Sequence, residues 1–196
     1  MKKLMMGFLT FAIVTTLANQ LLAQAPQFRC TLTEATAPTV RGLKLGMTTQ
    51  QVVDLFPAVI KRREMKDDIE KAKAGGSEVV YLAFEPAGDG GGDRFAGVAS
   101  VVTGLQKNKV VDFSVTYVGP TWSSIDEWVA RLAEAFKLPN ALWVAGPSEN
   151  PNKVLRCSGI EIEAGIQGGG SSVRIRTTDS IKGPSSSGED NKRFKP

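Results

Sequence analysis

The stretch RGLKLGMTTQQVVDLFP, residues 41–57, places a short alternating segment and a single glycine directly before an apolar helix. Thr48 is a natural N-cap, and Pro57 should end or kink the helix near Phe56. A strand that passes through glycine into a helix can bind phosphate, but such a turn needs more glycine and a parallel sheet beyond it. We therefore interpret the stretch as an N-capped helix start that marks the fold, preceded by a short strand at residues 40–45.

A charged segment at residues 61–74 follows this helix and is expected to be a solvated helix or a mobile connection. Three strand-like runs come after it. They cover residues 79–85, 98–105 and 110–118, and the last two form a predicted hairpin across residues 106–109. Apolar and polar residues alternate on both strands, as a half-buried antiparallel pair requires. The expected pairs are Val98–Tyr117 and Val102–Phe113 on one face, and Val101–Ser114 and Thr103–Asp112 on the other.

The second half of the chain repeats this order of elements. Ser123 and Ser124 can cap a helix with an apolar stripe, and Pro139 follows its end. Three more strand candidates cover residues 142–145, 154–164 and 172–178. Opposite charges that face each other across two strands stabilise the pairing and help to fix its register. The last two candidates are expected to pair Ile162 with Ile175 on the inner face, and Glu161 with Arg176 and Glu163 with Arg174 on the outer face.

These patterns predict an α+β fold made of two tandem helix-plus-antiparallel-sheet units. Moving the second half back by 76 positions lays Ser124 on Thr48 and Val129 on Val53, which supports an architectural repeat. The helices should pack on one face of the strands, and the polar sides of the strands should form the other. The expected organisation is a signal peptide at residues 1–23, a first unit with its N-terminal segment at 24–119, a second unit at 120–178 and a disordered tail at 179–196.

The N-terminus has the pattern of a secretory signal peptide. Lys2 and Lys3 precede a nearly uninterrupted apolar run over residues 4–22, and Ala23 offers a small residue at the cleavage position. A bacterial lipoprotein would need a cysteine at the cleavage site, where Gln24 stands. We therefore expect a periplasmic or secreted mature protein without a membrane span, with a single-span anchor as the alternative.

Two cysteines in an exported protein are usually paired. Cys30 and Cys157 lie near opposite ends of the predicted fold, so a disulfide between them would tie the N-terminal segment to a late strand. Closing so long a loop stabilises a fold by on the order of 4 kcal/mol in the chain-entropy model. Two buried free thiols are the alternative.

The positive charge of the chain belongs to its ends. Between residue 24 and Thr178 there are 18 Lys and Arg residues against 17 Asp and Glu residues, a net charge of +1. A nucleic-acid-binding domain needs a basic stripe that displaces counterions from phosphates. The predicted folded part lacks such an excess, so we expect no nucleic-acid partner.

The inventory of reactive side chains argues against catalysis. The sequence contains no histidine, which removes the usual general base and the commonest metal ligand. Three carboxylate pairs could still perform acid–base chemistry. Helix surfaces or facing arginines offer a structural explanation for each pair, and the glycine clusters at residues 88–93 and 168–170 fit loops. We expect no catalytic residue, no metal and no cofactor. The three pairs are Asp67 and Asp68, Asp126 and Glu127, and Glu161 and Glu163.

The polar face of the predicted sheet is the candidate protein-contact surface. Tryptophan is enriched at protein interfaces, and two of the three tryptophans flank the second helix. Edge-of-core packing is the alternative for both of them. The candidate contact residues are Val101, Ser114, Thr116, Trp122, Trp143, Arg174 and Arg176.

The stretch GLKLGMTTQQVVDLFP, residues 42–57, resembles the opening motif of the small-lipoprotein family of the outer-membrane barrel-assembly machinery. In that family, too, a Gly-Met-Thr step precedes a helix that a proline follows. The tandem plan is similar to the β-lactamase inhibitory protein fold. The chain departs from the first family in lacking a lipobox cysteine, and from the second in showing no identifiable β-lactamase-contacting residue. The resemblance implies a non-enzymatic, protein-binding function and names no partner.

Four functional hypotheses follow from the sequence. The leading one is an exported, non-catalytic protein-binding module of the bacterial cell envelope or secretome. Its narrower variant is an inhibitor of a secreted or periplasmic enzyme. The others are a hydrolase that uses carboxylates, and a structural envelope protein whose basic tail touches anionic cell-wall polymers.

Overall fold

The computed structural model describes residues 29–119, 122–147, 149–167 and 170–181. The predicted signal peptide, residues 1–23, lies outside this part of the chain. So does the predicted disordered tail, except that residues 179–181 belong to the short helix α6 (Thr178–Ile181).

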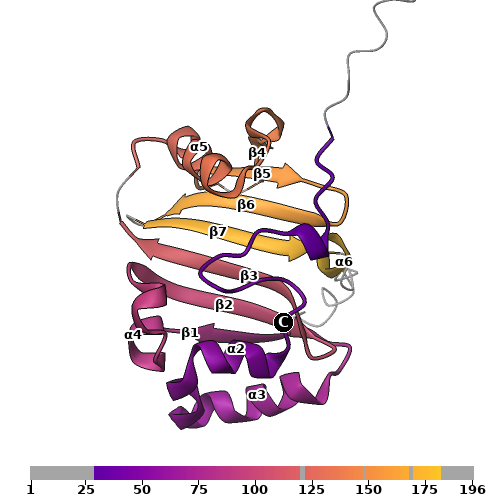
Figure 1. Cartoon of the computed structure of the whole chain (residues 1–196), viewed down its shortest axis with the longest axis vertical. Helices are drawn as coiled ribbons and strands as arrows, with labels where there is room; N and C mark the ends of the chain where they lie inside the picture. Colours follow the sequence, from indigo (N-terminus) through magenta and orange to yellow (C-terminus); the bar gives the residue numbers. More distant parts are fainter. Residues whose placement is uncertain (1–28, 120–121, 148, 168–169, 182–196) are drawn as a thin grey trace, which may run out of the picture.

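The described residues form a seven-stranded antiparallel sheet in the order β1-β2-β3-β7-β6-β5-β4 (Figure 1). Together with the helices, this sheet confirms the predicted α+β class. β3 and β7, each the last strand of its half of the chain, pair at the centre of the sheet. The strands are β1 (Val80–Phe84), β2 (Val98–Gln106), β3 (Lys109–Val118), β4 (Val144–Ala145), β5 (Asn152–Arg156), β6 (Ile160–Gln167) and β7 (Gly170–Thr177).

The predicted strand at residues 154–164 is wrong as a single element. A turn at Cys157, Ser158 and Gly159 divides it into the end of β5 and the start of β6, because Cys157 N–H donates to the Ile160 carbonyl. The register of β6 against β7 is confirmed, with Ile162 opposite Ile175, Glu161 opposite Arg176 and Glu163 opposite Arg174.

The register of β2 against β3 differs from the prediction in its middle. Val98 does pair with Tyr117, but Val101 lies opposite Val115 and Val102 opposite Ser114. Irregularities at Val98/Ser100 and Gly104/Leu105 shift the central pairs by one residue. Since side chains alternate between faces, this shift moves Val101 and Thr103 to the buried face.

The two principal helix starts follow the sequence prediction. Thr48 caps α2 (Thr49–Leu55) with a capping box, in which Thr48 N–H donates to the Gln51 side chain at 2.9 Å. Pro57 ends α2 and begins the 3₁₀ helix η2 (Pro57–Lys61). Ser124 caps α5 (Ile125–Phe136). The charged segment forms α3 (Arg63–Ala74), which buries only Met65, Ile69 and Ala72.

The predicted short strand at residues 40–45 is wrong, because residues 40–43 form a tight turn instead. Val40 and Leu43 exchange two backbone hydrogen bonds of 2.9 Å, and Arg41 and Gly42 between them have φ values of 54° and 92°. Two consecutive residues at positive φ define a type I′ turn, where glycine carries no steric cost. The side chains of Val40 and Leu43 are buried.

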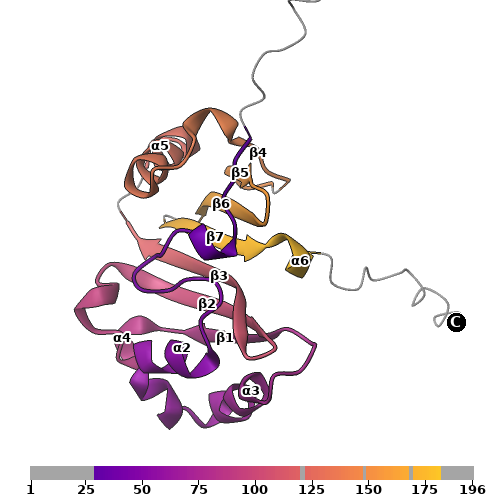
Figure 2. The same ribbon diagram turned by 45° about the vertical axis from the view of Figure 1, so that its right-hand side comes forward.

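The N-terminal segment, residues 29–47, crosses one face of the sheet between α2 and α3 at one end and α5 at the other (Figures 1 and 2). It includes the single 3₁₀ turn η1 (Glu34–Thr36) and adds Val40, Leu43, Leu45 and Met47 to the core. The predicted disulfide between Cys30 and Cys157 ties its start to the β5–β6 turn. At its other end, Gly46 N–H donates to the Val110 carbonyl at 2.8 Å.

The two faces of the sheet have different compositions. The covered face packs against the helices and the N-terminal segment, and its residues Leu82, Phe113, Ile162 and Ile175 are at most 1% exposed. The open face carries the alternate residues, which are mainly half-buried polar side chains. The remaining short helices, α4 (Pro86–Asp89), η3 (Gly92–Phe95) and η4 (Asn140–Leu142), lie in connections between strands and helices.

Candidate functional site

The open face brings together four of the seven predicted contact residues. Ser114 and Thr116 on β3 alternate with buried residues, and Arg174 on β7 lies directly opposite Ser114. Arg176 follows two residues later on the same face, opposite Asp112. All four side chains are half-buried, so each has surface available to a partner.

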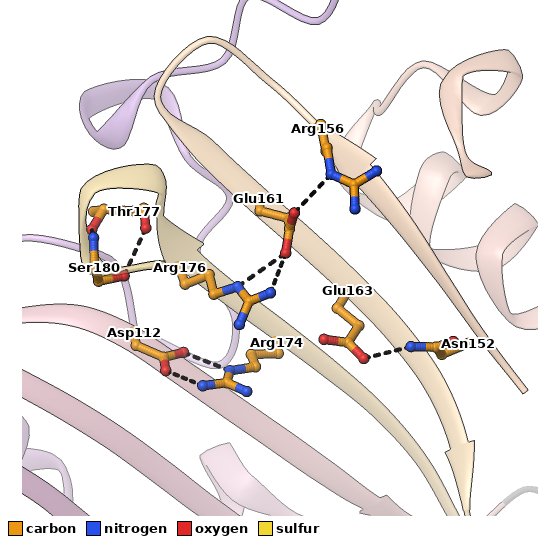
Figure 3. A network of polar contacts seen from close by, with 9 residues as sticks. All are labelled: Asp112, Asn152, Arg156, Glu161, Glu163, Arg174, Arg176, Thr177 and Ser180. Atoms are coloured by element: carbon orange, nitrogen blue, oxygen red, sulfur yellow. Dashed lines mark hydrogen bonds and ion pairs between the residues drawn. The ribbon is translucent and has the colours of Figure 1, made fainter. Parts of the chain in front are cut away.

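Asp112 and Arg174 form a two-pronged ion pair on this face (Figure 3). Arg174 Nε donates to Asp112 Oδ1 at 2.9 Å, and Arg174 Nη2 donates to Oδ2. The Asp112 side chain is buried, whereas the Arg174 side chain retains 38% of its exposure. The hydrogen bond to Asp112 raises the pKa of Arg174 above its ordinary value and holds it in the charged form.

Glu161 is the second buried acid of the open face and accepts from two arginines (Figure 3). Arg176 Nε lies 3.0 Å from Oε1, and Arg156 Nε lies 3.1 Å from Oε2. Glu163 instead accepts from Asn152 at 2.7 Å and leaves Arg174 to Asp112. Three arginines thus face three acids, so the charges of this face cancel and it has no bias toward an anionic or a cationic partner.

A hollow of about 180 Å³ lies beside the Asp112–Arg174 pair and is bordered by Tyr81, Val102, Gly104 and Ser114. Gly104 makes room for the Tyr81 ring, because a Cβ at position 104 would lie 2.9 Å from a ring carbon of Tyr81. Tyr81 therefore lies over the sheet and remains 54% exposed. A shallow hollow with an aromatic wall and an ion pair is a suitable seat for one protruding side chain of a partner.

Large exposed apolar residues also lie on the open face, at its two opposite edges and at the end of β3. Of the four in the described part of the chain, Tyr81, Val118 and Val144 project from it, as their register with neighbouring strands shows. The fourth, Ile60, lies on η2. These residues were not predicted as contact residues, because they occupy strand ends and edge strands, where alternation gives little signal.

Three predicted contact residues lie elsewhere. Val101 is fully buried on the covered face, so its assignment to the open face is wrong. Trp143 is only 8% exposed and belongs to the core, as the edge-packing alternative expects. Trp122 is half-buried and stacks on Trp128 with ring centroids 5.4 Å apart, which places it on the covered side near α5.

Members of each candidate acid pair form ion pairs or hydrogen bonds with neighbouring side chains. Asp126 forms an ion pair with Lys153, and Glu127 accepts from the Ser123 hydroxyl at 2.6 Å. That hydrogen bond lowers the pKa of Glu127. Asp68 lies 3.6 Å from Lys71 on the surface of α3. The third pair, Glu161 and Glu163, is held by the open-face contacts of Arg156, Arg176 and Asn152.

Asp89, which was predicted to lie in a flexible glycine-rich loop, is a buried acid at the end of α4. It accepts from Arg62 at 3.0 Å and from the Glu85 backbone N–H at 2.8 Å, so it anchors α4 to the end of β1. Among the described residues, no group of three or more Cys, Asp or Glu side chains could hold a metal ion. Within the same residues, every helix is too short or too polar to span a bilayer.

Comparison with protein-family models, with curated proteins and with solved structures finds no significant match for this chain.

Proposed function

We propose that this protein is an exported, non-catalytic module that binds another protein through the open face of its sheet. The observation that carries the proposal is that three of the four large exposed apolar residues in the described part of the chain share one charge-balanced face, two at its opposite edges and one at the end of β3. Interfaces combine such apolar and aromatic anchors with a polar surround, and tyrosine and arginine dominate their binding energy. The cancelled charges favour a partner surface of mixed polarity, which is typical of a protein.

The chemistry of the buried acids supports a binding role over a hydrolytic one. The oxygens of Asp112 and Glu161 already accept guanidinium N–H groups, so these carboxylates are committed to the sheet. The predicted signal peptide and the Cys30–Cys157 disulfide both support an oxidising compartment outside the cytoplasm, periplasmic or extracellular.

The arginines are poor positions at which to test this proposal. Reversing the charge of Arg174 would set two acids against each other at the buried Asp112 and would perturb the fold together with any interface. Thr116 is a better position, because it is half-buried at the centre of the open face and makes no ion pair. Thr39, which is exposed in the N-terminal segment, provides a matched control.

The test replaces Thr116 or Thr39 by a photo-crosslinking amino acid in the secreted or periplasmic protein of the native host. We expect a protein that crosslinks from position 116 and not from position 39. With that protein purified, Thr116→Arg should weaken binding by about tenfold or more in calorimetry, the equivalent of a modest hot spot. Thr39→Arg should bind as the wild type does, and both variants should keep the wild-type melting temperature.

Equal crosslinking from both positions, or equal affinity of both arginine variants, would overturn the proposal. The same purified pair also tests the inhibitor alternative. If the partner is an enzyme, its activity should fall in proportion to its occupancy by the wild-type protein. An unchanged enzyme activity would exclude the inhibitor alternative and would support binding without inhibition.

A further inference from the structure

A second hollow, of about 610 Å³, opens where α5, the end of β3 and the turn at Arg41 meet. Ligand pockets for small molecules commonly occupy about 300–1,000 Å³. We name this hollow the aromatic groove. It lies on the covered side of the sheet, because Tyr117 in its wall alternates with the open-face residue Thr116. It is therefore separate from the surface proposed above.

The wall of the groove is a fixed aromatic stack. Trp122 stacks on Trp128 at 5.4 Å, and Tyr117 meets Trp128 edge to face at 5.7 Å. Trp128 is held in place because its indole N–H donates to the Ser172 carbonyl at 2.9 Å. A preformed wall of this kind offers a flat apolar surface at little cost in side-chain entropy.

Small residues keep the groove open. Gly97 and Gly119 line it at φ values of 77° and 53°, and a Cβ built at either would meet nothing within 4 Å. Ala135 lines it from the exposed side of α5. The backbone at these glycines disfavours any larger residue, so the turn geometry itself preserves the space.

The rim of the groove carries an excess of positive charge. Arg41 and Arg131 line it, with Glu134 as the only acid among the lining residues, and Glu134 lies 3.5 Å from Arg131. The Arg41 guanidinium forms a hydrogen bond with the Tyr117 phenol, and no ion pair joins it to a carboxylate in the described part of the chain. In addition, the buried indole N–H of Trp122 finds no acceptor among the described residues. An incoming oxygen anion would complement the Arg41 guanidinium at the rim, whereas the Trp122 indole nitrogen is itself shielded from solvent.

We propose that the aromatic groove binds an amphipathic carboxylate, with a flat aromatic body against the Trp122–Trp128–Tyr117 wall and the carboxylate beside Arg41. The size of the groove and its aromatic wall select the body of the ligand. The unpaired charge of Arg41 selects its headgroup, since a guanidinium binds a carboxylate by charge-assisted hydrogen bonds.

The indole N–H signals of the three tryptophans in a ¹⁵N-labelled protein allow a direct test. The probe is 2-naphthoate, and 2-naphthalenemethanol is its uncharged counterpart. We expect 2-naphthoate to shift the Trp122 and Trp128 signals and to leave the Trp143 signal in place, because Trp143 does not line the groove. Binding of the alcohol should be at least about tenfold weaker, which corresponds to the loss of one charge-assisted contact.

Two variants with matched controls locate the site. Ala135→Phe should fill the groove and abolish the shifts, whereas Ala130→Phe, on another exposed position of α5, should not. Arg41→Gln should reduce the affinity for 2-naphthoate to that for the alcohol, whereas Arg63→Gln should have no effect. Circular dichroism establishes that each variant is folded. Absence of shifts, equal binding of acid and alcohol, or equal effects of a variant and its control would overturn the proposal.

Discussion

Two neighbouring rows of residues cross the same six strands of the sheet, one on each face. The covered row contains Leu82, Thr103, Phe113, Ile175, Ile162 and Leu155, and all of them are buried. The open row contains Tyr81, Gly104, Asp112, Arg176, Glu161 and Arg156. The covered row is held mainly by contact between apolar side chains. In the open row Arg156 and Arg176 form ion pairs with Glu161, and the Tyr81 ring lies beside Gly104 at the other end.

This difference shows that two independent sets of contacts fix the register of the sheet, the apolar packing on the covered face and the ion pairs on the open face. A slip of one residue would move Phe113 to the open face and bring Asp112 under the helices. The apolar row would lose its burial, and the acids would lose their arginines, so both faces oppose the slip. Because the ion pairs fix the alignment without large apolar side chains, the open face remains available for a partner.

The largest expected effect tests the covered row. Phe113→Ala should lower the free energy of unfolding by about 3–5 kcal/mol, because Phe113 is only 1% exposed and its loss leaves a cavity. Ser114→Ala, at the next position on the open face, should change it by less than about 0.5 kcal/mol. Urea unfolding of both variants measures the difference, and similar costs for the two would contradict the division between the faces.

The second effect concerns the disulfide that tethers the N-terminal segment, residues 29–47, to the sheet. Replacing Cys30 and Cys157 together by alanine should lower the free energy of unfolding by about 2–5 kcal/mol, because the cross-link spans 127 residues. Adding a reductant to the wild type should produce the same loss and leave the double variant unchanged. A variant as stable as the wild type would show that the N-terminal segment needs no tether.

The third effect tests the ion pair that Asp112 of the open row makes with Arg174. Arg174→Met should cost about 1–3 kcal/mol, because it leaves the buried Asp112 without a charged partner, and the partial exposure of Arg174 limits the loss. Combining it with Asp112→Leu should recover much of that loss. A double-mutant cycle in urea measures the coupling. If Arg174→Met had no effect, the ion pair would contribute nothing to the register.

The strand pairings show what could be predicted from the sequence. The β6–β7 register was predicted correctly because both strands alternate without interruption and opposite charges face each other. The β2–β3 register was wrong in its centre because a bulge leaves no mark on composition, and this error placed Val101 on the open face. Only the ends of that hairpin, such as Val98 and Tyr117, kept the predicted pairing.

The candidate site was predictable in part for a similar reason. Thr116 and Arg176 lie in regular stretches of strand, where parity alone assigns a face. The position of the N-terminal segment depends on tertiary packing, since Val40, Leu43 and Leu45 follow no helical period and form no strand. The aromatic groove was missed because it joins Tyr117 and Trp122 to Arg41, which lies far from both in the sequence.

The smallest expected effect concerns the cap of α5, the helix that covers β5 and β6. The Ser123 hydroxyl donates to Glu127 at 2.6 Å and lowers the pKa of Glu127. Its contribution to stability is therefore fully present above the ordinary pKa of Glu. It is lost as the pH falls through the lowered pKa that Glu127 has in the folded protein. Ser123→Ala should therefore raise the pKa of Glu127 toward its ordinary value in a ¹³C NMR titration. Ser124→Ala removes the N-cap bond to the Glu127 backbone instead and should lower the melting temperature while the pKa stays low. If the two variants shifted the pKa of Glu127 equally, the N-terminus of α5 as a whole would set that pKa. The Ser123 hydroxyl would then not be its specific cause, and the pH dependence of stability at this helix end would not rest on that one hydroxyl.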